Sequence, residues 1–151
     1  MIILYMESTI ISASSILLTS YISSKFTRKN VNTNWYECIR PNITPPKYVF
    51  PVVWTILYVL LFFVFKDILD SKNKLLIVLF SINLLLNIIW TYYYFNQKDV
   101  NKSFIIILLI LLSSIVILYK TKNKLYLPYV LWISFASYLN YLSIDKITLC
   151  N

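Results

Sequence analysis

The sequence predicts an all-α integral membrane protein in which five transmembrane helices form one bundle, a single domain over residues 1–151. The first observation is composition: 59% of the residues are hydrophobic and 13% are charged, whereas a soluble domain is about half apolar and about a quarter charged. The second is that the apolar residues form blocks of roughly 17–25, which match the thickness of a bilayer core. The third is that Lys and Arg occur mainly in the short gaps between these blocks. We therefore expect the lipid bilayer as the partner of this chain.

The charge and the rare residue types exclude several classes of function. A net charge of +8 would suggest a nucleic-acid partner in a soluble protein, but here the basic residues flank apolar blocks and suit phospholipid headgroups. No nucleic acid is expected. The chain has no His and two Cys, which argues against Ser-His-Asp or Cys-His catalysis and against a zinc or haem-axial site, so no metal or cofactor is predicted. The sequence leaves open whether Cys38 and Cys150 form a disulfide.

The five spans are expected at residues 2–24, 48–65, 75–95, 103–119 and 125–144. The first lacks a basic n-region and is longer than the apolar core of a usual signal peptide, so a retained helix is expected. It carries Glu7, and its hydroxyl residues recur at helical spacing, which suits close packing on neighbouring helices. These residues are Ser8, Ser12, Ser15 and Thr19.

A polar, aromatic and proline-bearing loop, residues 25–47, separates the first two spans and is far longer than the other connections. A loop of this length in a compact domain is usually functional or disordered. The aromatic residues and prolines of this loop argue against disorder and favour a lid. They are Trp35, Tyr36, Pro41, Pro45 and Pro46. A small excess of Lys and Arg on the side of this loop favours a cytoplasmic location for it.

Three of the other spans carry an aromatic or polar stripe on one helix face, as the spacing of three, four and seven residues indicates. The second has Phe50, Trp54 and Tyr58; the third has Asn83, Asn87, Trp90 and Tyr94; the fifth has Trp132, Ala136 and Asn140. The fourth span is almost entirely aliphatic and is expected to face lipid over much of its surface. Because an asparagine in hydrocarbon is costly without a partner, the stripes should point into the bundle.

Two interpretations of the stripes are open. Interhelical hydrogen bonds and aromatic packing would account for each stripe separately. Three converging stripes would instead line an apolar, aromatic cavity with a few amide groups, as in a small-molecule site, and flat ligands would stack on its rings. Such a cavity would hold no carboxylate pair and no His, so general acid–base catalysis is not predicted.

Three motifs resemble those of the translocator protein family (TspO/MBR, formerly the peripheral-type benzodiazepine receptors). The order and spacing hold from about Trp35 to Tyr141, and the first span fits by length only. The loop and second span carry Trp35-Tyr36, Arg40-Pro41, Pro45-Pro46, Phe50, Pro51, Trp54 and Leu57-Tyr58; the third span carries Leu86-Asn87 and Trp90; the fifth carries Leu127-Pro128-Tyr129, Trp132, Phe135-Ala136 and Leu139-Asn140.

The resemblance implies a five-helix fold with a ligand cavity under the long loop. The ligand-binding residues that it implies are Trp35, Pro45, Trp54, Tyr58, Asn87, Trp90, Trp132, Ala136 and Leu139. The ligands of such proteins are porphyrins, notably protoporphyrin IX, together with sterols and benzodiazepine-type drugs. In bacterial members that degrade protoporphyrin in light, the catalytic residues match Trp54 and Trp132.

The chain departs from the family pattern at two places. Val78 and Ile82 stand on the third span where small residues spaced by four are proposed to pack a dimer, which puts close packing of a homodimer in doubt. Leu139, Tyr141 and Lys146 fit a loose sterol-binding pattern near the C-terminus, but Asp145 stands at the family's Arg position.

The leading hypothesis is a membrane binding protein, a carrier or sensor, for porphyrins and other tetrapyrroles or similar hydrophobic ligands. The alternatives are a light-dependent porphyrin-degrading enzyme using Trp54 and Trp132, and a sterol-binding or structural membrane partner protein.

Overall fold

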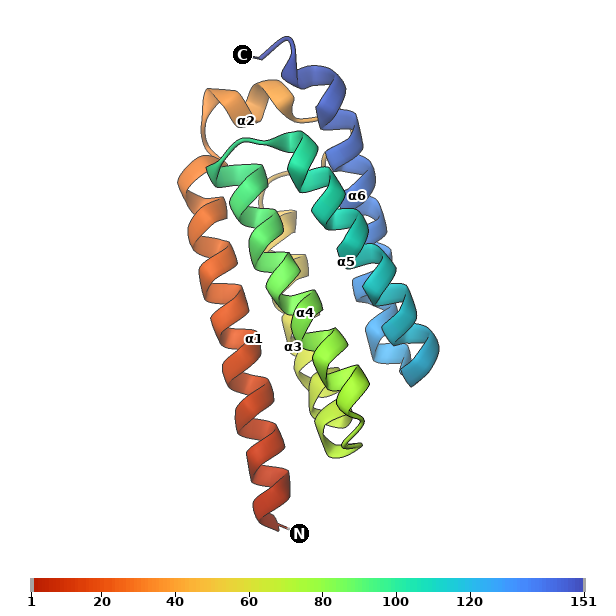
Figure 1. The fold of residues 1–151 in the computed structure, drawn as a ribbon. Coiled ribbons are helices and arrows are strands. Elements are labelled where there is room, and N and C mark those ends of the chain that lie inside the picture. The colour runs from red at the N-terminus through yellow and green to blue at the C-terminus, as the bar shows by residue number, and fades with distance from the viewer. Residues whose placement is uncertain (1, 151) are drawn as a thin grey trace.

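The computed structural model describes residues 2–150, with side chains from Met6 onward. Within this part the chain is helical and has no strand. The elements are α1 (Ile2–Asn30), α2 (Asn34–Ile39), α3 (Val49–Asp70), α4 (Lys74–Thr91), a π-helix η1 (Tyr92–Asn96), α5 (Val100–Thr121), a 3-10 turn η2 (Lys124–Tyr126) and α6 (Leu127–Ile147). The long helices run side by side, and short α2 lies across the end of the bundle where the C-terminus also lies (Figure 1).

Three of the five predicted spans are confirmed as helices long and apolar enough to cross a membrane: Val49–Asp70, Lys74–Asn96 and Val100–Thr121. Helices α1 and α6 are long enough, with 29 and 21 residues, but they do not have the same apolar composition within the described residues. The predicted boundaries were too narrow. The first helix continues to Asn30, well past residue 24, and the second continues to Asp70.

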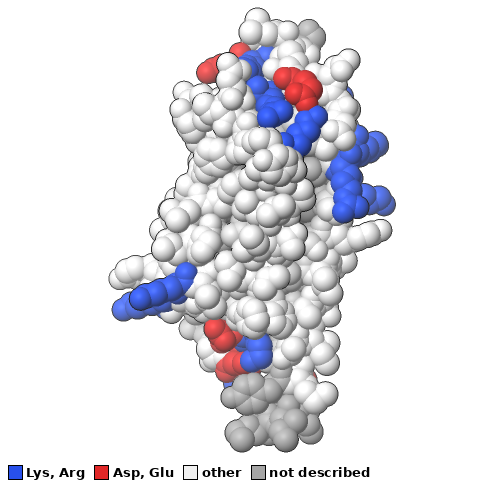
Figure 2. All heavy atoms as spheres, turned by 180° about the vertical axis from the view of Figure 1, so that it is seen from behind, with Lys and Arg blue, Asp and Glu red and all other residues white. Residues whose placement is uncertain are grey.

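The outer surface of the bundle is apolar at mid-height. Charged side chains gather toward the two ends of the face that Figure 2 shows, with an uncharged band between them. Helix α5 illustrates the division. Its outer face exposes Ile105 and Leu112, both 61% accessible, while Ile107 and Ile110 are completely buried. This agrees with the expectation that the helix faces lipid over much of its surface, while its remaining side is buried in the bundle.

The short connections between the long helices use the same pair of residues, a lysine followed by Asn or Asp. The lysine adopts the left-handed conformation that glycine usually supplies, and the next residue caps the following helix through its side chain; the pairs are Lys72-Asn73, Lys98-Asp99 and Lys122-Asn123. A left-handed non-glycine residue costs roughly 1–2 kcal/mol. A cation at a helix C-terminus offsets part of this cost, which is how a chain without glycine turns tightly.

A buried polar network joins α4, α5 and α6 near the middle of the bundle. The Asn83 amide donates to Ser113 Oγ at 2.7 Å, to Ser114 Oγ at 2.9 Å and to the Ile110 carbonyl at 3.1 Å. Its oxygen accepts from Tyr129 Oη at 2.9 Å. Asn83 is 1% exposed, so its stripe does point inward, and its own polar groups are satisfied within the protein as the bilayer core requires.

Helix α1 is held against α3 by its hydroxyl groups. Ser8 Oγ donates to Asp70 Oδ1 at 2.6 Å, and Ser12 Oγ donates to the Phe62 carbonyl at 2.7 Å. Ser8, Ser12 and Thr19 are buried. Ser8 and Ser12 thus lie at a helix–helix contact, as their spacing predicted, whereas Ser15 is half-buried and the Thr19 hydroxyl bonds the Ser15 carbonyl of its own helix.

We predict that Asn83→Ala destabilises the bundle, because it leaves the Tyr129 hydroxyl and two serine hydroxyls without this partner. Hydrogen bonds between membrane helices contribute about 0.6 kcal/mol each, so a loss of about 1–2 kcal/mol is expected in a reversible unfolding titration in detergent. Ser81→Ala is the control, since the exposed Ser81 hydroxyl bonds only its own helix. Equal stability of the two variants would contradict the role given to Asn83.

Candidate functional site

A cavity of about 1320 Å³ lies between α1, α3, α4 and α6, and the segment that connects α1 and α3 contributes to its lining. No residue of α5 lines it within the described chain. Most of its wall is apolar. Its polar groups fall into two sets, a few amide and indole groups deep in the bundle and a hydroxyl-rich corner beneath the connecting segment.

The deep part of the cavity is aromatic on the α3 and α6 sides. Trp54 and Tyr58 lie one turn apart on α3 with ring centroids 5.4 Å from each other. Phe50, a further turn back, meets Trp132 of α6 edge-on at 5.8 Å. These four rings line the cavity. The i, i+4 spacing that suggested a common face therefore places them in one wall.

Helix α4 adds amide and indole groups to this wall. The Trp90 indole N–H donates to Asn140 Oδ1 at 3.0 Å, so both side chains are used in holding α4 to α6. Asn87 is 2% exposed and reaches the Tyr129 hydroxyl with its amide nitrogen at 3.5 Å. Its amide oxygen has no partner, and neither does the buried indole nitrogen of Trp132. The deep part of the cavity therefore presents one acceptor and one donor that the protein leaves unpaired.

Tyr129 is a residue whose role the sequence analysis did not assign. It is completely buried, contacts Trp54 at 6.4 Å between ring centroids and bonds both Asn83 and Asn87. It thus ties two side chains of α4 to α6 and packs its ring against α3. The sequence could have indicated its inward position, because Tyr129 stands three residues before Trp132 and therefore on the same side of the helix.

Seven of the predicted binding residues line the cavity: Trp54, Tyr58, Asn87, Trp90, Trp132, Ala136 and Leu139. Trp35 and Pro45 do not. Trp35 turns to Tyr94, at 6.2 Å, and to the Lys98 ammonium, while its neighbour Tyr36 lines the cavity. In a helix, adjacent residues point about 100° apart, so α2 can direct only one of the two rings inward. Ligand contact by any of these residues stays a prediction.

The connecting segment contains a helix, α2, and charged side chains brace it internally. Glu37 forms ion pairs with Lys47 and, at 3.6 Å, with Arg40. The hydrogen bond from Lys47, helped by the two positive charges, lowers the pKa of Glu37. Arg40 also donates to the carbonyls of Thr44 and Pro45 at 3.2 and 3.1 Å. The segment is a structured cover, which agrees with the expectation against disorder.

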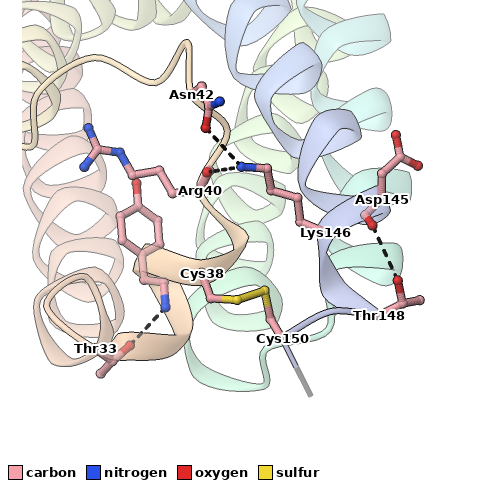
Figure 3. Close-up of a disulfide and its surroundings, with 9 residues drawn as sticks. Thr33, Cys38, Arg40, Asn42, Asp145, Lys146, Thr148 and Cys150 are labelled. Atoms are coloured by element: carbon pink, nitrogen blue, oxygen red, sulfur yellow. Dashed lines mark hydrogen bonds between the residues drawn. A yellow bond between two sulfur atoms is a disulfide. The ribbon is translucent and has the colours of Figure 1, made fainter.

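A disulfide joins this cover to the end of the chain. Cys38 of α2 is bonded to Cys150, just after α6, across a sequence separation of 112 residues and with Cα atoms 5.8 Å apart (Figure 3). Beside it, the Lys146 ammonium donates to the Arg40 carbonyl at 2.9 Å and to Asn42 Oδ1 at 3.3 Å. The bridge that the sequence left open is therefore formed, and the cover is attached to α6.

Comparison with known proteins identifies relatives along most of the chain. A sequence model described as the TspO/MBR family matches residues 11–144. A protein of Chlorobaculum tepidum named "Tryptophan-rich protein TspO" is 30% identical over 136 residues, 83% of this chain and 86% of the relative. Proteins of the same name from Archaeoglobus fulgidus (28% over 137 residues, 84% and 88%) and Bacillus cereus (26% over 121 residues, 74% and 79%) are also similar.

Proposed function

The chain belongs to the TspO/MBR family, and on this premise we propose that it is a binding protein, a carrier or sensor, for porphyrins and similar hydrophobic ligands. It is an integral, multi-pass membrane protein. The proposed site is the cavity under the segment between α1 and α3. The family supports the ligand class, and the residues of this chain support the site.

The observation that carries the proposal is a large aromatic cavity with unpaired polar atoms. Its volume of about 1320 Å³ exceeds the roughly 300–1,000 Å³ of usual drug-sized pockets. A flat macrocycle could stack against Trp54, Tyr58 and Trp132. The free oxygen of Asn87 and the free N–H of Trp132 would then bond a ligand that carries both a donor and an acceptor, as a tetrapyrrole does.

We further propose that α1 and α6 also cross the bilayer, which gives five spans. Ser8 and Ser12 of α1 and Asn140 and Ser143 of α6 are buried, while Leu17 of α1 and Leu131 of α6 are 68% and 62% exposed. Each helix therefore offers lipid an apolar side that its average composition hides.

A homodimer through α4 would meet Val78 and Ile82, which are 55% and 45% exposed. Their branched side chains keep helices further apart than glycine would.

Light-dependent degradation of bound porphyrin is the second candidate, because Trp54 and Trp132 line one cavity and could both contact one ring. Illumination of the complex distinguishes the two: a new absorbing product, lost in Trp132→Phe, indicates degradation.

Sterol binding through the C-terminal pattern is less favoured. Leu139 lines the cavity, Tyr141 is 51% exposed, and Lys146 is bonded to Arg40, so the three side chains do not form one surface.

We predict saturable quenching of tryptophan fluorescence when protoporphyrin IX is added to the purified protein. Replacing Trp54 and Trp132 together by Phe should weaken binding by about tenfold, since two stacking contacts of about 0.5–1.5 kcal/mol each are altered. Trp35→Phe is the matched control, because Trp35 lies outside the cavity lining, and it should leave affinity unchanged. Absence of saturable quenching, or equal affinity in all variants, would refute the proposal.

A further inference from the structure

We propose that the ligand is an amphipathic anion whose negatively charged end lies beneath the segment between α1 and α3, against Arg28. The inference rests on the proposed function and adds the charge and orientation of the ligand. Its basis is the distribution of charge around the cavity. Arg28 and Lys47 line the cavity, and no Asp or Glu of the described chain does.

The two cations share one corner. Arg28 lies one turn before Asn32, and the Asn32 side chain accepts a hydrogen bond from Lys47 at 3.1 Å. Lys47 is already paired with Glu37. Arg28 forms no ion pair or hydrogen bond with the described residues and is exposed. Its guanidinium is therefore available to a carboxylate, which it can bind with two parallel hydrogen bonds.

A second observation points to a polar ligand group at the same end. Thr44, in the cover, lines the cavity and is 8% exposed, and its hydroxyl has no partner. A buried hydroxyl without a partner costs stability. A carboxylate in this corner would accept from Thr44 and face Arg28, while the apolar body of the ligand would extend into the aromatic part of the cavity.

The test compares protoporphyrin IX, which carries two carboxylates, with its dimethyl ester, which has the same ring and no charge. Both are titrated into protein held in neutral-lipid nanodiscs. We expect the dicarboxylate to bind more tightly, and Arg28→Gln to weaken its binding about threefold or more while leaving ester binding unchanged. Lys29→Gln is the matched control, with the same charge change next along α1 but outside the cavity lining. Added salt should reduce the difference.

Equal effects of Arg28→Gln on the two porphyrins would overturn the inference, because Arg28 would then not act through the carboxylates. Tighter binding of the ester would also overturn it. Failure of both porphyrins to bind would refute the proposed function instead, so the two failures are distinguishable.

An independent observation, the disulfide, supports a second inference: we propose that Cys38–Cys150 is a redox-modifiable tether that controls how readily the cavity opens. The tether acts on the cavity wall directly, because Tyr36, Pro41 and Thr44 line the cavity in the segment that Cys38 anchors. Without the bridge, the attachment of this segment to α6 depends on the hydrogen bonds of Lys146 and on packing.

The chemistry is exchange with a dithiol. The Sγ–Sγ bond breaks and takes up two electrons and two protons, giving two thiols, while the dithiol is oxidised to a disulfide. A stable bridge requires that the cover face an oxidising compartment, and a reducing one would release it. The small excess of basic residues on this side favoured the cytoplasm, where such a bond would be transient. The tether would then report the redox state of its compartment.

Reduction with dithiothreitol should speed dissociation of bound porphyrin several-fold and increase cleavage of residues 31–48 by trypsin. The double variant Cys38→Ser/Cys150→Ser should show the fast rates without reductant and no response to it. Lys146→Met is the control that removes the neighbouring hydrogen bonds and keeps the bridge, so it should still respond. Unchanged cleavage after both thiols are shown by alkylation to be free would overturn the inference, whether or not porphyrin binds.

Discussion

The rule that most of this structure depends on is that a polar group inside a bilayer must find its partner within the protein. Asn83 meets it with bonds to α5 and α6, and Asn140 meets it with bonds from Trp90 and Ser103 and to the Val100 carbonyl. These two asparagines fix α4, α5 and α6 as a unit. Among the stripe residues of α3, α4 and α6, the rule is not met at the Asn87 oxygen and the Trp132 indole nitrogen, and both residues line the cavity.

The cavity differs from the core in how its wall is secured. Helices α4 to α6 are joined by buried side-chain bonds, whereas the cover between α1 and α3 is braced by ion pairs within itself and attached to α6 by the disulfide and the hydrogen bonds of Lys146. Surface ion pairs contribute little stability individually. The aromatic wall is formed by α3 and by α6 of this bonded unit, and the hydroxyl-rich, positively charged corner lies beneath the cover. In the proposed function, the bundle would recognise the body of the ligand and the cover would control access to the cavity.

Helical periodicity was enough to predict which faces of α3, α4 and α6 turn inward. The Trp and Asn residues of each helix recur on one face, and a face with polar groups is costly in contact with lipid. It could not predict which residues of the cover face the cavity. Trp35 and Tyr36 are adjacent, and only the docking of α2 determines that Tyr36 faces inward. The disulfide pairs residues far apart in the chain. The inner side of α5 was missed because Ser103 and Ser114, which bond Asn140 and Asn83, look unremarkable in an aliphatic sequence.

The central claim is that the space between the aromatic stripes is the binding site, and filling that space tests it most directly. Ala136 is 7% exposed and lines the cavity on α6. Wild-type protein and Ala136→Phe, matched for helical content by circular dichroism, would be incubated with protoporphyrin IX and separated from free ligand, and the porphyrin absorption band of each would be measured. The account predicts about one porphyrin per wild-type chain and almost none for the variant. Equal bands would contradict it.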